Sequence, residues 1–302
     1  MRSFYSHGKL LLTGEYAVLK GAKALAVPCK KGQILSYKEA DNTHLRWRSI
    51  DFKGLSWFEA EFDVCDLKLL TASDDKIWKN LVKLLQACKA LNPSFLKKGG
   101  VVETKLEFNR LWGLGSSSTL VSSFSQWANV NPYQLLKMSF GGSGYDIACA
   151  QATGPIIYKK TSHLPEIKAT MLNYPFSNQL YFIYLNQKRD SQEAVAQFNL
   201  KALKASHIEK VSIITEKILE TTDLNEFNQL LKTHEEIIAE LLNQRPIQED
   251  LFSDFDGTIK SLGAWGGDFI LASSTTDPTQ YFTEKGYEVI IPFKEMILET
   301  SS

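Results

Sequence analysis

The segment Leu111–Thr119 constrains the fold more than any other part of this chain, because two glycines and three serines separate a strand-like run from a helix-like run. The first run, Val101–Phe108, alternates polar and apolar residues, as a half-buried strand does. Glycine lets a backbone turn tightly and approach a ligand. A helix that begins directly after such a turn presents N–H groups and the positive end of its dipole to an anion. The segment therefore predicts a phosphate-binding turn.

The three serines, Ser116–Ser118, stand where the predicted helix begins. Their hydroxyls can donate hydrogen bonds to phosphate, and any of them can be an oxygen ligand of Mg²⁺. A serine at this place also caps a helix. The residues alone leave both roles open.

Two further glycine-rich segments stand near the ends of the chain. Gly8–Leu19 reads G-K-L-L-L-T-G-E-Y-A-V-L, and Gly263–Asp268 reads G-A-W-G-G-D. With the central G-L-G-S-S-S they resemble, in the same order, the three motifs of the GHMP kinases. The first motif is most similar to the form found in phosphomevalonate kinases. We therefore identify the chain, by resemblance, as a GHMP kinase of the phosphomevalonate kinase and mevalonate kinase branch.

The resemblance implies an α+β fold, with a ribosomal-S5-like domain over residues 1–165, a ferredoxin-like domain over residues 166–302 and the active site between them. It implies ATP and Mg²⁺ as cofactors, with Ser117 as the best match for a metal ligand and Ser116 and Ser118 as alternatives. It assigns nucleotide binding to Gly113, Leu114, Gly115, Ser116, Ser117, Ser118, Gly263, Gly266 and Gly267.

A fourth segment, Gly141–Ala148, resembles the G-S-G-x-D segment of phosphomevalonate kinases. The resemblance makes Asp146 catalytic, as a base or an orienting group for the acceptor, although an aspartate beside glycines also suits a turn. Lys9 matches the lysine of the first motif, where a cation lowers the pKa of the aspartate and neutralises developing charge. Substrate binding is assigned to Glu15, Tyr16, Ser143, Gly144, Lys188 and Ser191; the first two of these either line the acceptor pocket or pack beneath it.

The sequence departs from the family pattern at two places. Trp265 stands where the family has glycine, so its ring either narrows the site or stacks on the nucleotide. The family's helix before Asp146 often carries a metal-binding glutamate, but Val130–Ser139 contains no acidic residue. Metal binding would then use fewer protein ligands or another carboxylate.

Other functions fit less well. No G-x-x-x-x-G-K-[ST] motif is present, which argues against a Walker-type nucleotide hydrolase. Asp254–Thr258 mimics the D-x-D-G-T motif of haloacid-dehalogenase-like phosphatases, but it follows polar residues where that motif follows an apolar strand, so we expect a turn or a capped helix start. Lys and Arg number 34, as do Asp and Glu, and this balance favours neither nucleic acid nor membrane partners.

The bulk sequence predicts a cytoplasmic α+β protein. It has no long apolar run and no secretory signal, and it leaves a homodimer open. Cys29, Cys65, Cys88 and Cys149 are scattered, which favours reduced thiols over a zinc site. Expected strands are His44–Arg48, Trp57–Phe62, Leu180–Leu185 and Glu288–Ile291, and expected helices are Asp74–Leu91, Leu200–Thr221 and Leu224–Asn243.

The resulting functional prediction is an ATP-dependent kinase that transfers the γ-phosphoryl group to a small anionic acceptor. Mevalonate or phosphomevalonate, and hence isoprenoid biosynthesis, is the preferred branch. Two alternatives stay open: an ATP-dependent decarboxylase of the diphosphomevalonate decarboxylase type, and a nucleotide-binding homologue without catalysis.

Overall fold

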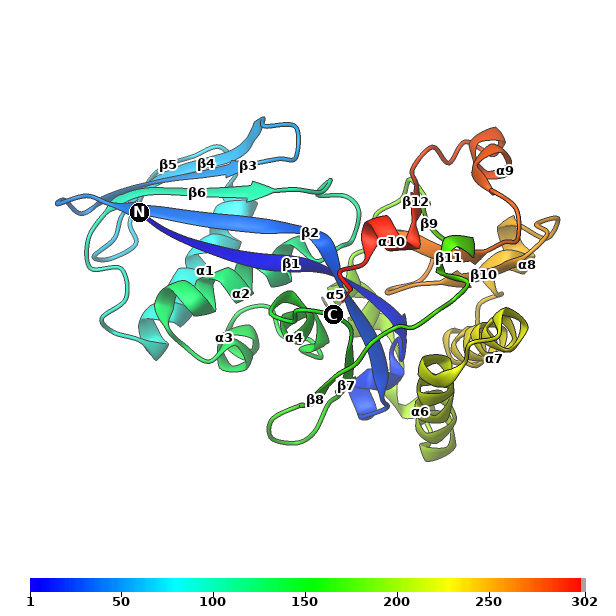
Figure 1. Ribbon diagram of the computed structural model, residues 1–302. Helices are drawn as coiled ribbons and strands as arrows, with labels where there is room; N and C mark the ends of the chain where they lie inside the picture. Colours follow the sequence, from blue (N-terminus) through cyan, green and yellow to red (C-terminus); the bar gives the residue numbers. More distant parts are fainter. Residues whose placement is uncertain (300–302) are drawn as a thin grey trace. The chain divides into compact units, whose positions relative to one another are not determined.

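The computed structural model describes residues 1–299, apart from the side chain of Gln192. Contacts divide the chain into two compact units (Figure 1). The first unit contains Met1–Gly8, Lys31–Arg110 and Leu114–Gln151; the second contains Lys9–Lys30, Leu111–Gly113 and the chain from Ala152 onward. Both units are discontinuous in sequence. The predicted division at residues 165 and 166 concerns family domains and stays a prediction.

The first unit is built on a sheet in the order β5-β4-β3-β6-β2, with β1 beside β2. Strand β2 continues into the second unit, where Ala24–Ala26 pairs with β7, and β7 pairs with β8. The strands are β1 (Arg2–Thr13), β2 (Ala24–Glu39), β3 (His44–Ile50), β4 (Ser56–Asp63), β5 (Leu69–Ala72), β6 (Gly100–Leu106), β7 (Ile156–Lys159) and β8 (Glu166–Ala169).

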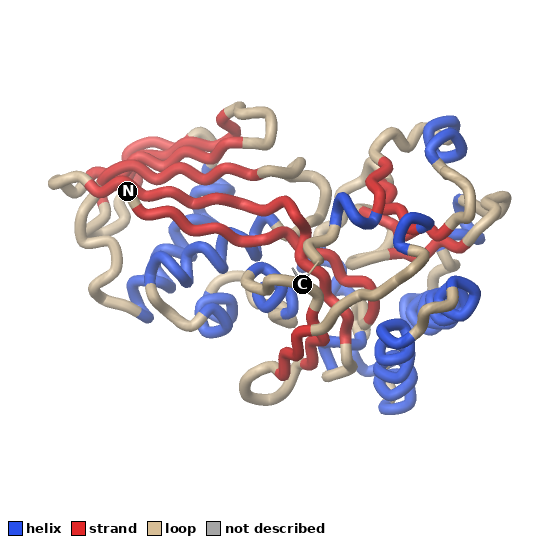
Figure 2. Tube along the Cα trace, in the orientation of Figure 1, coloured by secondary structure: helices blue, strands red, loops and turns tan. Residues whose placement is uncertain are grey.

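Four helices lie on one face of the first unit's sheet (Figure 2). They are α1 (Asp75–Leu91), α2 (Ser116–Ala128), α3 (Pro132–Met138) and α4 (Tyr145–Ala150). The alternation in β6 decides which side chains reach them, since Val102 and Thr104 are buried while Glu103 and Lys105 are not. The strand predicted from this alternation is confirmed.

Helix α1 begins where its sequence predicts. Asp74 precedes it in an extended conformation, and its Oδ1 accepts the N–H of Ile77 at 2.9 Å. The helix buries Leu81, Leu84 and Leu85 on the predicted stripe. A capped start and a stripe at helical spacing are local signals, so the sequence suffices to place this helix.

The second unit contains an antiparallel sheet in the order β10-β11-β9-β12. Its strands are β9 (Leu180–Tyr184), β10 (Thr258–Ser261), β11 (Phe269–Ser273) and β12 (Ile290–Pro292). Helices α6 (Ala205–Glu220) and α7 (Leu224–Leu242) pack on each other, and α7 packs on β10. Shorter elements are η1 (Ala17–Lys20), η2 (Ser177–Gln179), α5 (Ser191–Gln197), η3 (Leu200–Ala202), α8 (Ile247–Leu251), α9 (Thr279–Glu284) and α10 (Phe293–Met296).

The helix predicted over Leu200–Thr221 starts late. Leu200–Ala202 forms the separate 3₁₀ turn η3, in which Asn199 accepts the N–H of Lys201, and α6 begins only at Ala205. Residues 253–257 form the expected turn, which leads into β10. The α+β class is confirmed.

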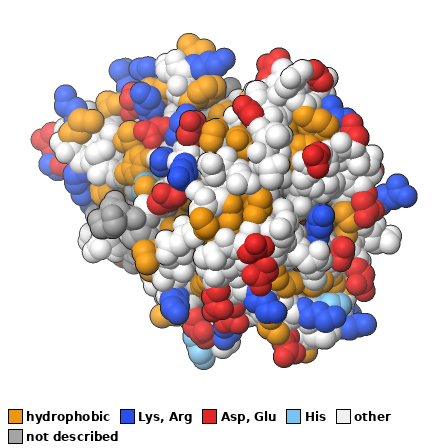
Figure 3. All heavy atoms as spheres, turned by 45° about the vertical axis from the view of Figure 1, so that its right-hand side comes forward, with side chains coloured by type: hydrophobic (Ala, Val, Ile, Leu, Met, Phe, Trp, Pro, Cys, Tyr) orange, Lys and Arg blue, Asp and Glu red, His pale blue; other side chains and the backbone are white. Residues whose placement is uncertain are grey.

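Surface charge is mixed. Lys, Arg, Asp and Glu side chains are interspersed on the face in Figure 3, and no single sign covers it. Within residues 1–299, no helix combines the length and the apolar character needed to cross a membrane. None of the four cysteines, all of which lie within residues 1–299, takes part in a disulfide.

Candidate functional site

The predicted phosphate-binding turn consists of two left-handed glycines followed by a helix. Gly113 has φ +65° and Gly115 has φ +84°, and α2 begins at the next residue, Ser116. The carbonyl of Gly115 accepts the N–H of Thr119 at 2.9 Å and the hydroxyl of Ser118 at 2.8 Å. The first N–H groups of a helix have no partner within it. The turn therefore leaves the start of α2 suited to an anion.

The three serines have different surroundings. Ser117 is exposed and Ser116 is half-buried, whereas Ser118 is buried and its hydroxyl is directed back to Gly115. The hydroxyls of Ser116 and Ser117 are thus the better placed of the three for a phosphate or a metal. Ser117 as a Mg²⁺ ligand stays a prediction.

Residues from all three motifs meet within the second unit. The ammonium group of Lys9 donates to the carbonyl of Gly113 at 3.0 Å, and only 9% of Lys9 is exposed. The carboxylate of Asp268 lies directly against Gly113, because a Cβ atom added there would be 2.2 Å from Asp268 Cγ. Our sequence reasoning named Lys9 and Gly113 but not Asp268. The sequence feature that could have identified Asp268 is its position as the last residue of the third motif.

Asp268 is held by the loop that follows β9. Its carboxylate accepts the backbone N–H of Arg189 at 3.2 Å, and its own N–H donates to the carbonyl of Gln187 at 2.6 Å. Burial raises the pKa of Asp268, while the hydrogen bond from Arg189 and the nearby charge of Lys9 oppose the rise. The charges of Lys188 and Arg189 act on Asp268 in the same direction as that of Lys9, which also holds the phosphate turn.

The third-motif loop, defined here as Leu262–Asp268, leaves no room for a side chain at Gly267. A Cβ atom there would be 2.7 Å from the carbonyl of Gln187 and 2.6 Å from Cγ of Arg189. Gly263 and Gly266 have φ of +63° and +70°. Bare backbone at Gly267 is thus needed for the close approach of Gln187 and Arg189, and the nucleotide-binding role of the three glycines stays a prediction.

Trp265 is part of the core of the second unit. It is 2% exposed and packs with Tyr16, Leu203, Val211 and Ile238. Its backbone has φ +61°, a conformation that suits glycine, and its carbonyl accepts Nε of Arg189 at 3.1 Å. A buried ring offers no exposed face for stacking on a nucleotide, so of the two roles considered for it, stacking finds no support in these contacts.

Glu15 and Tyr16 are both buried, and each is hydrogen-bonded to a distant segment of the second unit. Glu15 is fully buried and its Oε1 accepts Nζ of Lys260 at 2.5 Å. The hydroxyl of Tyr16 donates to the carbonyl of Ala264 at 2.8 Å, which ties the first motif to the third-motif loop. Burial raises the pKa of Glu15 to about 7, although the charge of Lys260 opposes this rise.

Asp146 lies in the first unit, at the start of α4. Gly144 precedes the helix with φ +91°, and Oδ1 of Asp146 accepts the N–H of Ile147 at 3.0 Å. Burial raises the pKa of Tyr133 to about 12, and the negative charge of Asp146 adds to the rise. Ser143 is half-buried beside them. Lys9 belongs to the second unit, so its pairing with Asp146 stays a prediction.

Lys188 and Ser191 lie in an exposed stretch of the second unit, between β9 and the start of α5. The carboxylate of Asp190 accepts the N–H of Glu193 at 3.2 Å and thereby caps α5. Lys188 directly precedes Arg189, whose N–H binds Asp268, and its positive charge opposes the rise in the pKa of Asp268 that burial causes.

The residues suit nucleotide phosphates better than a protein-bound metal cluster. The glycine turn supplies backbone and leads into α2, and within the second unit Lys9 supplies a cation at Gly113. Among residues 1–299, no group of three His, Cys, Asp or Glu side chains is arranged to hold a metal. Helix α3 carries no acidic residue, as expected from the sequence. Serine hydroxyls are the ligands that this loop offers to Mg²⁺.

Comparison with known proteins defines the fold. No family model matches the chain, and no curated protein matches its sequence. Among solved structures, Streptococcus pneumoniae phosphomevalonate kinase in complex with phosphomevalonate and AMPPNP aligns with a TM-score of 0.70 at 15% identity, covering 94% of this chain and 95% of that one. Methanococcus jannaschii mevalonate kinase gives 0.65 at 15% identity, covering 94% of each chain.

Lactococcus lactis galactokinase complexed with galactose also aligns, with a TM-score of 0.67 at 15% identity, over 99% of this chain and 94% of that one. The class suggested by the motifs is thus confirmed at the level of the fold. The chain has the GHMP kinase fold over nearly its whole length. Among these neighbours are proteins named for mevalonate, phosphomevalonate and sugar substrates.

We expect Gly113→Ala to destabilise the protein more than Gly54→Ala. Both positions have positive φ, which costs an alanine about 1 kcal/mol, but a Cβ atom meets nothing within 4 Å at Gly54 and meets Asp268 at Gly113. Urea unfolding of both variants measures the difference. The additional replacement Asp268→Ala removes the Cγ and Oδ atoms that the new Cβ atom would meet, and it should recover part of the loss. Equal losses in the two alanine variants would contradict the contact.

Replacing Trp265 with glycine or with alanine should destabilise the protein to different extents. Loss of the buried ring costs about 3–5 kcal/mol. Glycine relieves the positive φ by about 1 kcal/mol, whereas alanine does not. The free energy of unfolding should therefore decrease from wild type to Trp265→Gly to Trp265→Ala. An alanine variant more stable than the glycine variant would show that the backbone at this residue is not strained.

Glu15 should make stability depend on pH near neutrality. Its folded-state pKa of about 7 lies above the unfolded value of 4.5, so the folded protein binds the proton more tightly. Its contribution is therefore greatest at low pH and decreases as pH rises from about 4.5 to about 7. The free-energy difference between wild type and Glu15→Gln, measured by urea unfolding, isolates this contribution from that of Glu235. A difference that does not change with pH would contradict it.

Proposed function

We propose that this protein is an ATP-dependent small-molecule kinase. The observation that carries the proposal is the meeting of Lys9, Gly113 and Asp268 within one unit, because it brings three distant sequence motifs together at a glycine turn that leads into a helix. The GHMP kinase fold supports it. A cation and backbone N–H groups fixed before substrate arrives are what phosphoryl transfer requires.

Each part of the chain has a role in this proposal. Gly113, Gly115 and the start of α2 bind the nucleotide phosphates, and Lys9 neutralises negative charge there. When bound, ATP with Mg²⁺ supplies the phosphoryl group and offsets its charge, and Ser117 is the metal ligand. Asp146 orients the acceptor oxygen, and it removes a proton where the acceptor is a hydroxyl.

We further propose a small anionic acceptor of the mevalonate or phosphomevalonate kind. The resemblance of the first motif to phosphomevalonate kinases supports this choice, as does the exposed cation Lys188 close to Asp268. A phosphate acceptor is already ionised at neutral pH, so Asp146 would then act mainly by positioning it. A sugar acceptor would require Asp146 as a base. The acceptor therefore decides how strongly activity depends on this carboxylate.

The test is ATP consumption by this protein with Mg²⁺ and mevalonate, phosphomevalonate, diphosphomevalonate, homoserine or galactose. We expect turnover with one acceptor. With a hydroxyl acceptor, Asp146→Asn should lower kcat by roughly 100-fold or more. The matched control is Asp254→Asn in the exposed turn before β10, which should leave turnover unchanged.

The other outcomes assign the other functions. Release of carbon dioxide from diphosphomevalonate would identify a decarboxylase. ATP binding measured by calorimetry without turnover on any acceptor would contradict the proposed kinase and favour a non-catalytic binding protein. The absence of an acidic residue in α3 is consistent with that second function.

A further inference from the structure

A cluster of four ionisable side chains is buried in the second unit. Glu15, His234 and Lys260 are fully buried and Glu235 is 2% exposed. They come from the turn after β1, from α7 and from β10. A buried charge is costly unless it is paired and hydrogen-bonded. We call these four residues the buried charge cluster.

The cluster holds the end of β10, where the third-motif loop begins. The ammonium group of Lys260 donates to Glu15 Oε1 at 2.5 Å and to the carbonyl of Ser261 at 2.7 Å. The carboxylate of Glu235 accepts the N–H of Ser261 at 3.0 Å and its hydroxyl at 2.8 Å. Ser261 is thus fixed through its N–H, hydroxyl and carbonyl groups.

The same cluster holds the first motif. Nε2 of His234 accepts the backbone N–H of Gly14 at 2.9 Å, so the proton of the neutral ring is on Nδ1. Gly14 has φ +94° and has no room for a side chain, because a Cβ atom would be 2.5 Å from that of Ala24. Tyr16, two residues after Gly14, donates a hydrogen bond to the carbonyl of Ala264. The first motif and the third-motif loop are therefore fixed to one buried framework.

The third-motif loop connects this framework to the phosphate turn. It starts directly after Ser261, is held in the middle at Ala264, and ends at Asp268, which lies against Gly113. Each of these points is fixed by a directional hydrogen bond or a close contact, so the path of the seven residues from Leu262 to Asp268 is defined at both ends and in the middle. A core of apolar side chains would bury the same volume without fixing these directions.

We propose that Lys260, Glu235 and His234 are positioning residues, which set the third-motif loop against the phosphate turn. None of them was assigned a role from the sequence. The inference rests on the proposed kinase function. These residues act through Leu262–Asp268 and do not themselves contact substrate.

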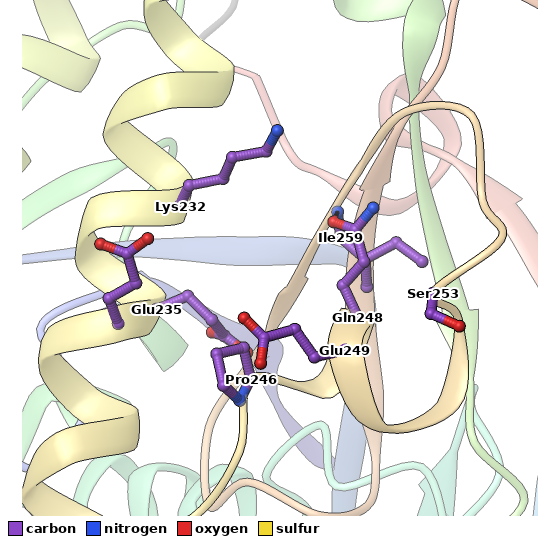
Figure 4. Close-up of a pocket in the computed structure, with 8 residues that line it drawn as sticks. Lys232, Glu235, Pro246, Gln248, Glu249, Ser253 and Ile259 are labelled. Atoms are coloured by element: carbon purple, nitrogen blue, oxygen red, sulfur yellow. Dashed lines mark hydrogen bonds between the residues drawn. The ribbon is translucent and has the colours of Figure 1, made fainter.

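The positioning role is best tested at the residues of the buried charge cluster that are least accessible to solvent. On its outer side, Glu235 borders a hollow of about 330 Å³ between α7, α8 and β10 (Figure 4). The other lining residues are Lys232, Glu236, Pro246, Gln248, Glu249, Ser253 and Ile259. Neither Lys260 nor Glu15 is among the residues that line this hollow. Lys260 and Glu15 are sealed, so substitutions there report on the cluster more cleanly.

The test compares Lys260→Met with the double variant Glu15→Gln and Lys260→Met in the full-length protein. The single variant leaves a carboxyl group without its cation and should lower Tm, whereas the double variant removes both partners and should recover most of that loss. We expect kcat of the double variant to stay at least tenfold below wild type, with KM for ATP changed less than threefold. A double variant with wild-type Tm and wild-type kcat would overturn the inference.

Tyr16→Phe provides a milder test that does not depend on the charges. It removes only the hydrogen bond to Ala264, since the ring stays in the core. We expect kcat to fall threefold or more while Tm changes little; an unchanged kcat would count against the inference. Lys23→Met is the matched control, because it removes a surface ion pair with Glu216 in the same unit and should change neither kcat nor KM.

A measurement without substrate separates this inference from the kinase itself. Protein labelled with 5-fluorotryptophan gives a ¹⁹F resonance for Trp265, identified by its loss in Trp265→Phe. We expect this resonance to shift in the double variant, whose two substituted residues lie outside the apolar cluster around Trp265, but not in Lys23→Met. A wild-type protein without any turnover would refute the proposed function alone, whereas an unshifted resonance would refute the positioning role alone.

Discussion

The contact between Gly113 and Asp268 is the constraint on which the rest of the candidate site depends. Residue 113 has to be glycine because the carboxylate of Asp268 occupies the volume that a Cβ atom would need. The negative charge needs a cation nearby, and Lys9 supplies it while also donating to Gly113. One close contact, between the Asp268 carboxylate and Gly113, thus brings together residues from three segments far apart in the sequence.

Local signals in the sequence were sufficient for much of the fold. Asp74 marks the start of α1, and the alternation around Val102 marks β6, because a cap and a period of two are properties of a few neighbouring residues. The predicted helix start at Leu200 was wrong, and the cause is local as well. Asn199 captures a backbone N–H, so a tight 3₁₀ turn replaces the first turn of the expected helix.

The site was less predictable, because its environment comes from distant segments. Resemblance found Lys9 and Gly113, but the buried partner of Glu15 is Lys260, which is 245 residues away. Nothing near Lys260 in the sequence distinguishes it from a solvated lysine. The pKa of Glu15 has the same origin, since its rise is caused by complete burial, which no local pattern encodes.

Trp265 shows how a departure from a motif can be compatible with the same geometry. Its backbone keeps the positive φ that a glycine would adopt, and its carbonyl is still bound by Arg189. The ring is accommodated because α6 and α7 leave room for it beside Tyr16, in the core of the second unit. The loop can therefore keep its course past Asp268, while the cost of the strained backbone is offset by the apolar area that the ring buries.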